Sequence, residues 1–217
     1  MKHPEQLLES LFDQMLRSLP INGEPKPALF HPLFYTYPYA LRFEMGNPEI
    51  ACAAAWEAYC DAASQRAQAL FRGIFSPEDE VLVIFDRTPD REVKNAFQGC
   101  RMQRVRARAY PAFLEDREEY DESWFYRYLY LGKASQIPAE LVLQRIIEGE
   151  VLGGKHPYYS SCVYFYNVTK SLLFHMYDDR GADLIATSPD VLVTYYDGLN
   201  DMLLDYDREK MAEKLGL

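Results

Sequence analysis

The residue types best suited to chemistry fall in two short segments that lie far apart in the chain. Residues 177–181 read Tyr-Asp-Asp-Arg-Gly, and Asp183 follows two residues later. Two carboxylates and a guanidinium at one turn could bind a cation, or a partner's arginine through a bidentate pair. The simpler interpretation is a type I turn with a left-handed Gly181 between two strands. The further oxygen ligands of a calcium loop are missing, so no metal site is predicted.

The second segment carries opposite charges on a predicted strand. Arg42 and Glu44 share one strand face by the period of two, while Leu41 and Phe43 lie on the other face. A half-buried ion pair there stabilises little overall but costs much when one partner is removed. An active-site acid held by an arginine is the alternative. The two segments together supply the candidate binding residues Arg42, Glu44, Asp178, Asp179, Arg180 and Asp183.

A third group of charges lies on another predicted strand, where Arg104, Arg106 and Arg108 alternate along one face. Taken alone, they suggest a site for a phosphate or another anion. Six carboxylates follow within residues 115–122. Because these two segments could pair across a hairpin, we favour internal neutralisation over ligand binding.

Motifs of nucleophilic catalysis are missing from the sequence. It contains no Gly-x-Ser-x-Gly elbow, and its four histidines have no partner by motif. Cys162 and His175 could meet on adjacent strands, but only proximity recommends that pair. The glycines of residues 153–155 lack the strand-to-helix context of a phosphate loop. No cofactor is predicted, and the sequence does not decide whether the protein is an enzyme.

Composition and charge restrict the class of protein. The chain has 217 residues, 48% of them hydrophobic, and its 17 tyrosines and 12 phenylalanines can fill a sizeable core. A formal net charge of -10 argues against nucleic-acid binding and favours a basic protein partner. No signal peptide, membrane-spanning run or metal-type cysteine pair is visible, so a cytoplasmic protein is expected.

Helices and strands alternate in the first part of the chain, and consecutive hairpins follow. The predicted helices cover residues 7–19, 48–72, 90–97, 138–147 and stretches beginning at 189 and 205; the predicted strands cover 39–45, 81–85, 101–110, 124–131, 162–167, 172–177 and 182–187. Residues 20–38 are rich in proline and predict an extended loop. This order predicts an α/β (α+β) fold with a mixed, largely antiparallel sheet flanked by helices. We expect one domain over residues 1–217, with the helix and connector of residues 1–30 packed on it.

Several blocks of the sequence resemble a known family. They are residues 34–44 with Leu-Arg-Phe-Glu, residues 174–183 with Tyr-Asp-Asp-Arg-Gly, and residues 196–200 and 204–208. Together they resemble the bacterial family called domain of unknown function 3885, over about residues 30–214. The resemblance implies a small bacterial protein without an established activity. It marks Arg42, Glu44, Asp178, Asp179, Arg180, Asp207 and Arg208 as family positions and gives none of them a catalytic role.

Three functions are compatible with these features. The leading hypothesis is a non-enzymatic protein-binding module of the immunity or antitoxin type, because the chain is small, acidic and without catalytic motifs. An enzyme of unrecognised type would need a cleft formed by Arg42, Glu44 and residues 178–180. A sensor of a small anionic ligand would use Arg104, Arg106 and Arg108.

Overall fold

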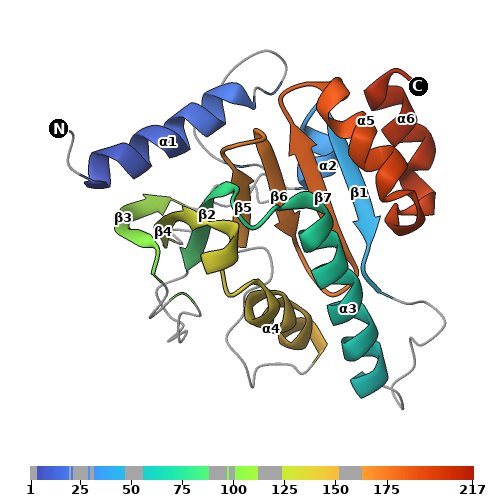
Figure 1. The fold of residues 1–217 in the computed structure, drawn as a ribbon, viewed down its shortest axis with the longest axis horizontal. Coiled ribbons are helices and arrows are strands. Elements are labelled where there is room, and N and C mark those ends of the chain that lie inside the picture. The colour runs from blue at the N-terminus through green and yellow to red at the C-terminus, as the bar shows by residue number, and fades with distance from the viewer. Residues whose placement is uncertain are drawn as a thin grey trace.

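The fold is built on one antiparallel sheet (Figure 1). A computed structural model describes residues 4–19, 21, 29, 32–46, 56–87, 97, 101–111, 124–151 and 163–217. The strands are β1 (Ala40–Glu44), β2 (Glu80–Arg87), β3 (Gln103–Pro111), β4 (Trp124–Lys133), β5 (Val163–Asn167), β6 (Leu172–Met176) and β7 (Gly181–Ala186). They form a seven-stranded sheet in the order β1-β7-β6-β5-β2-β4-β3, and all neighbouring pairs run antiparallel. The predicted α+β class, with a largely antiparallel sheet flanked by helices, is confirmed.

Six α-helices surround this sheet in the described part of the chain. They are α1 (Pro4–Ser18), α2 (Leu33–Thr36), α3 (Trp56–Ile74), α4 (Ala139–Val151), α5 (Pro189–Gly198) and α6 (Arg208–Leu215), with short 3-10 turns at Ala134–Gln136, Asn200–Met202 and Asp205–Asp207. The extended loop predicted for residues 20–38 is wrong over α2. The helix predicted from residue 48 is described from Trp56 onward, and most of the helix predicted for residues 90–97 lies outside the described residues.

The two faces of the sheet carry different side chains. On one face, Phe71 of α3 packs against Phe165 and Phe174, which are paired across β5 and β6. One residue further along these strands, Tyr164 and His175 stack on each other with ring centroids 4.4 Å apart. Because side chains alternate along a strand, this second pair belongs to the opposite face. α3 therefore packs on an apolar face of the sheet, whereas the opposite face also buries ionisable groups.

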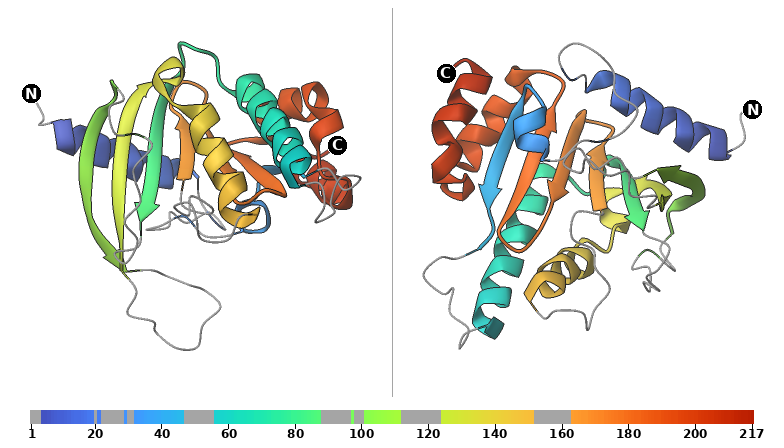
Figure 2. Two further views of the ribbon diagram at one scale, coloured as in Figure 1. Left: turned by 90° about the horizontal axis from the view of Figure 1, so that it is seen from below. Right: turned by 180° about the vertical axis from the view of Figure 1, so that it is seen from behind.

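The helices are distributed over the two faces and one edge of the sheet. α3 and α4 pack against each other beside the apolar face, while α1 crosses the far side of β2, β3 and β4 (Figure 2). α2 contacts β1 and β7, and α5 and α6 cover the β1 edge (Figure 1). On that edge, the backbone carbonyl of Arg42 accepts a hydrogen bond from Leu204 N–H at 2.9 Å. The β1 edge is thus closed by the C-terminal part of the chain.

None of the helices described by the structure has both the length and the apolar character needed to cross a membrane.

Candidate functional site

The β1–β7 pairing creates a buried ion pair. Arg42 lies directly opposite Asp183 in the register of the two strands. The guanidinium donates to the carboxylate twice, from Nε to Oδ1 at 2.9 Å and from Nη2 to Oδ2 at 3.3 Å. Asp183 Oδ2 also accepts from the backbone N–H of Phe34 at 3.0 Å, which ties α2 to the sheet. Both charged residues are buried. The predicted Arg42–Glu44 pair is therefore wrong, because Arg42 is paired with the opposite strand.

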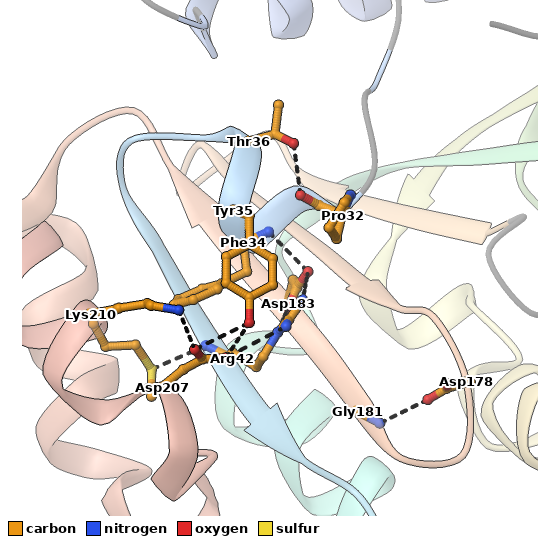
Figure 3. A network of polar contacts seen from close by, with 11 residues as sticks. Pro32, Phe34, Tyr35, Thr36, Arg42, Asp178, Gly181, Asp183, Asp207 and Lys210 are labelled. Carbon is orange, nitrogen blue, oxygen red and sulfur yellow. Dashed lines mark hydrogen bonds and ion pairs between the residues drawn. The ribbon is translucent and has the colours of Figure 1, made fainter. Parts of the chain in front are cut away.

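A second carboxylate faces Arg42 from the C-terminal part of the chain. Asp207 Oδ2 lies 3.6 Å from Arg42 Nη1 and accepts from the Tyr35 hydroxyl at 3.0 Å. Lys210 Nζ lies 3.4 Å from Asp207 Oδ1. Figure 3 shows how α2, β1, β7 and the start of α6 bring these groups together. We call Tyr35, Arg42, Asp183, Asp207 and Lys210 the Arg42 cluster.

Aromatic rings enclose the guanidinium of Arg42. Its central carbon lies 5.0 Å, 4.6 Å and 5.3 Å from the ring centroids of Phe34, Tyr35 and Tyr177. These distances are within the range of cation–π attraction. Burial lowers the pKa of Arg42, but hydrogen bonds and charge attraction from Asp183 outweigh it and hold the pKa above its ordinary value. Arg42 is a permanent cation inside the fold.

Burial also acts on the acidic and phenolic groups around Arg42. It raises the pKa of Asp183, against the opposing effects of the Arg42 guanidinium and the Phe34 N–H. The pKa of Tyr35 is raised by burial and by its hydrogen bond to Asp207. Tyr35 therefore remains a neutral hydrogen-bond donor to Asp207 near neutral pH.

The charged side chains of the 177–181 turn have partners within the chain. Asp178 Oδ1 accepts from the backbone N–H of Arg180 at 2.8 Å and of Gly181 at 3.1 Å. Its second oxygen forms an ion pair with the Arg180 guanidinium. Asp179 accepts from the Tyr59 hydroxyl of α3 at 2.6 Å. The two carboxylates proposed as ligands thus already have partners within the chain.

Gly181 is needed at this turn for a reason other than the predicted one. Its φ is not positive, so the left-handed glycine expected here is wrong. A Cβ on Gly181 would lie 2.0 Å from the Tyr177 hydroxyl and 3.1 Å from the Phe43 carbonyl oxygen. The missing side chain lets Tyr177 and β1 approach the backbone closely.

The two sequence segments do converge in space. Glu44 lies opposite Gly181 in the β1–β7 register, and the Arg180 carbonyl accepts from Met45 N–H at 2.8 Å. Glu44 itself is half-buried, and its carbonyl accepts from Arg66 Nε at 3.1 Å. All six candidate residues therefore belong to β1, β7 or the turn before β7, although their charges are mostly directed at one another.

The three arginines of the predicted basic face belong to β3. Arg104 and Arg106 lie opposite Tyr130 and Tyr128 of β4, not opposite carboxylates. The β3–β4 register shifts between Arg106 and Ala109. The acidic segment of residues 115–122 lies outside the described residues, so the predicted neutralisation stays a prediction. Cys162 lies outside them too.

Sequence reasoning missed a second buried ion pair. Arg127 of β4 donates to Asp86 of β2 from Nε to Oδ1 at 2.7 Å and from Nη2 to Oδ2 at 2.6 Å. Arg127 is 2% exposed. Burial raises the pKa of Asp86, and the charge of Arg127 opposes the rise. The available signal was an arginine within an otherwise aromatic strand, because such a buried cation requires a partner.

The described residues contain no group of three His, Cys, Asp or Glu side chains arranged to hold a metal ion. The Arg42 cluster combines charged side chains with the aromatic ring of Tyr35. It joins a helix near the start of the chain to a helix near its end.

The chain belongs to a family without an assigned activity. A family model described as domain of unknown function (DUF3885) matches residues 21–207. This match confirms the resemblance read from the sequence and contains both buried ion pairs. No curated protein and no solved structure matches the chain.

Proposed function

We propose that this protein is a non-enzymatic, cytoplasmic protein-binding module of the immunity or antitoxin kind, and that it captures a basic partner. The observation that carries the proposal is the outer surface of the Arg42 cluster. There, Tyr35 is 48% exposed and Tyr206 is 83% exposed. Lys210 Nζ lies 4.9 Å from the Tyr35 ring centroid and 5.9 Å from that of Tyr206. We call Tyr35, Tyr206 and Lys210 the tyrosine patch.

The chemistry of the tyrosine patch supports protein recognition. Exposed tyrosines are enriched at the energetic centres of interfaces, because they offer a large apolar area and a hydroxyl at low entropic cost. A ring that is fixed before binding loses less freedom on association. The hydroxyl of Tyr35 is held by Asp207, which is fully buried. The buried cluster thus prepares part of the surface that a partner would contact.

The charge around the tyrosine patch favours a basic partner. Residues 189–217 contain seven carboxylates and three cations. Exposed acidic side chains in this part of the chain include Asp201, Asp205, Glu209 and Glu213. Acidic side chains around a binding surface increase the association rate of a cationic protein and disfavour the binding of acidic proteins.

An enzyme would require reactive groups that face a substrate. The charged atoms of Arg42 and Asp183 are directed at each other, and those of Asp178 and Arg180 form their own pair. This arrangement favours a preformed binding surface over a reacting cleft. In this proposal, Arg42 and Asp183 support the interface from beneath.

The test is affinity capture from the cells that carry this gene, followed by binding measurements with the captured protein. We expect Tyr206→Ala to weaken binding about 30-fold or more, as for a central interface tyrosine. Glu209→Lys should mainly slow association, with an effect that decreases at high salt. Asp61→Lys is the matched control, because Asp61 is an exposed acid on α3, away from the patch. Equal affinities for wild type, Tyr206→Ala and Glu209→Lys would refute the proposed surface.

A further inference from the structure

A row of polar side chains crosses four neighbouring strands on the face of the sheet opposite α3. His175 of β6 lies directly opposite Asp183 of β7, and Asp183 lies opposite Arg42 of β1. On its other side, His175 stacks on Tyr164 of β5, with ring centroids 4.4 Å apart and the ring planes inclined by 16°. Imidazole is the side chain whose charge ordinarily changes between about pH 5 and pH 8. His175 is therefore the member of the row that can respond to a moderate change in pH.

His175 lies in the core of this face and is 0% exposed. The Tyr177 ring centroid lies 6.2 Å from that of His175, and burial raises the pKa of Tyr177 above its ordinary value, so this phenol stays neutral. The charged and titratable side chains that face His175, or that lie next to those groups, are Tyr164 (β5), Tyr177 (after β6), Asp183 (β7), Arg42 (β1) and Tyr35 (α2). A charge on the imidazole would therefore form away from water.

The charges along this row are balanced while His175 is neutral. Both carboxylate oxygens of Asp183 accept hydrogen bonds from the Arg42 guanidinium, at 2.9 Å and 3.3 Å. Beyond Arg42, the Asp207 carboxylate lies 3.6 Å from Arg42 Nη1 and 3.4 Å from Lys210 Nζ. Two cations thus face two carboxylates, and a proton on His175 would add a third positive charge inside the fold. Burial disfavours such a charge, so the closed fold favours the neutral imidazole.

We propose that His175 makes this face of the sheet an acid-sensitive switch. In the closed form, the imidazole is neutral and stacked on Tyr164. In an open form, the imidazole reaches water and takes up a proton. Acid therefore shifts the population from the closed form to the open form, because a proton stabilises the form that binds it more tightly.

The direction of the pH effect follows from proton linkage. The unfolded chain carries a histidine with the ordinary pKa of about 6.5, whereas the closed form does not take up this proton. Stability is therefore greatest above about pH 6.5 and is lost as the pH falls below that value. One such proton changes the ratio of unfolded to folded protein about ten-fold between pH 7.5 and pH 5.5.

The test compares wild type with His175→Phe, which keeps a ring against Tyr164 but cannot become charged. Urea unfolding at pH 7.5 and pH 5.5 gives the ratio of unfolded to folded protein for each variant. We expect this ratio to rise about ten-fold more for wild type than for His175→Phe as the pH is lowered. Tyr164→Phe is the matched control, because it keeps both the stack and His175, and it should respond to pH as wild type does. Equal responses of wild type and His175→Phe would overturn the proposal.

Nuclear magnetic resonance on wild-type protein keeps the test decisive even when His175→Phe does not fold. We expect the His175 ring, assigned by its contact with Tyr164, to keep the chemical shifts of the neutral form in folded protein at pH 5.5, where an exposed imidazole is mostly protonated. A His175 ring that gains its proton in the folded protein at about pH 6.5 or above would overturn the proposal. This inference does not rest on the proposed function, because neither measurement uses a binding partner.

Discussion

Replacement of Arg42 by methionine removes the charge at the centre of the buried cluster. Asp183 then loses its contacts at 2.9 Å and 3.3 Å and keeps the Phe34 N–H at 3.0 Å. Breaking a buried ion pair from one side costs about 3–5 kcal/mol, a large part of the roughly 5–15 kcal/mol that stabilises a domain. Because burial raises the pKa of Asp183, the isolated carboxyl can take up a proton in acid. The loss should therefore be smallest below the ordinary carboxyl pKa of about 3.9 and should grow as the pH rises through the raised pKa of Asp183.

Urea unfolding followed by circular dichroism measures this loss as a change in the free energy of unfolding. Adding Asp183→Leu to Arg42→Met should recover part of it, because no buried charge of that pair remains. The Phe34 N–H then lacks its acceptor, so a deficit of about 1–3 kcal/mol should persist. Lys133→Met is the control, since its pair with Glu78 is exposed and should contribute about 1 kcal/mol or less. Two results would refute this reasoning. One is that Arg42→Met lowers the free energy of unfolding no more than Lys133→Met does. The other is that the effects of Arg42→Met and Asp183→Leu simply add in the double variant.

Two further perturbations test the turn and the acid response. Gly181→Ala should lower the free energy of unfolding by about 1–3 kcal/mol, because the new Cβ would lie 2.0 Å from the Tyr177 hydroxyl. Gly198→Ala is the control and should be nearly neutral, because a Cβ at that position has no neighbour within 4 Å. Equal melting temperatures for the two variants would contradict this prediction. For Asp79, burial acts to raise the pKa, but hydrogen bonds from a lysine, an amide and a backbone N–H lower it below 3.8. Stability from Asp79 is therefore present above pH 3.8 and is lost as the pH falls through the lowered pKa, so the Asp79→Asn variant should unfold with a weaker dependence on acid than wild type. Parallel acid titrations of the two proteins would contradict that assignment.

Much of the fold was predictable because it depends on local patterns. The apolar run at residues 81–85 and the two consecutive hairpins of β5, β6 and β7 define their strands without tertiary information. α2 was not predictable in the same way. A helix of four residues cannot form alone. It depends on a hydrogen bond from Phe34 N–H to Asp183, 149 residues away.

The candidate site was predictable in its residues but not in its pairs. The sequence marks both Arg42 and Asp183 as candidates, but it predicts that Arg42 pairs with Glu44, its neighbour on the same strand. The true pairing follows from strand order, which periodicity does not determine. Tyr35 and Lys210 were missed for the same reason, since nothing local connects α2 to α6.

The β1–β7 pairing also has a consequence for synthesis on the ribosome. Arg42 and Asp183 are separated by 141 residues. At about 5–20 residues per second, β1 leaves the ribosome roughly 7–28 seconds before its partner strand does. The β5–β6–β7 meander can assemble as soon as it emerges, whereas β1 can join the sheet only after β7 has been made. The newly made N-terminal part of this chain is thus exposed to chaperones and proteases for most of the time that the ribosome spends on it.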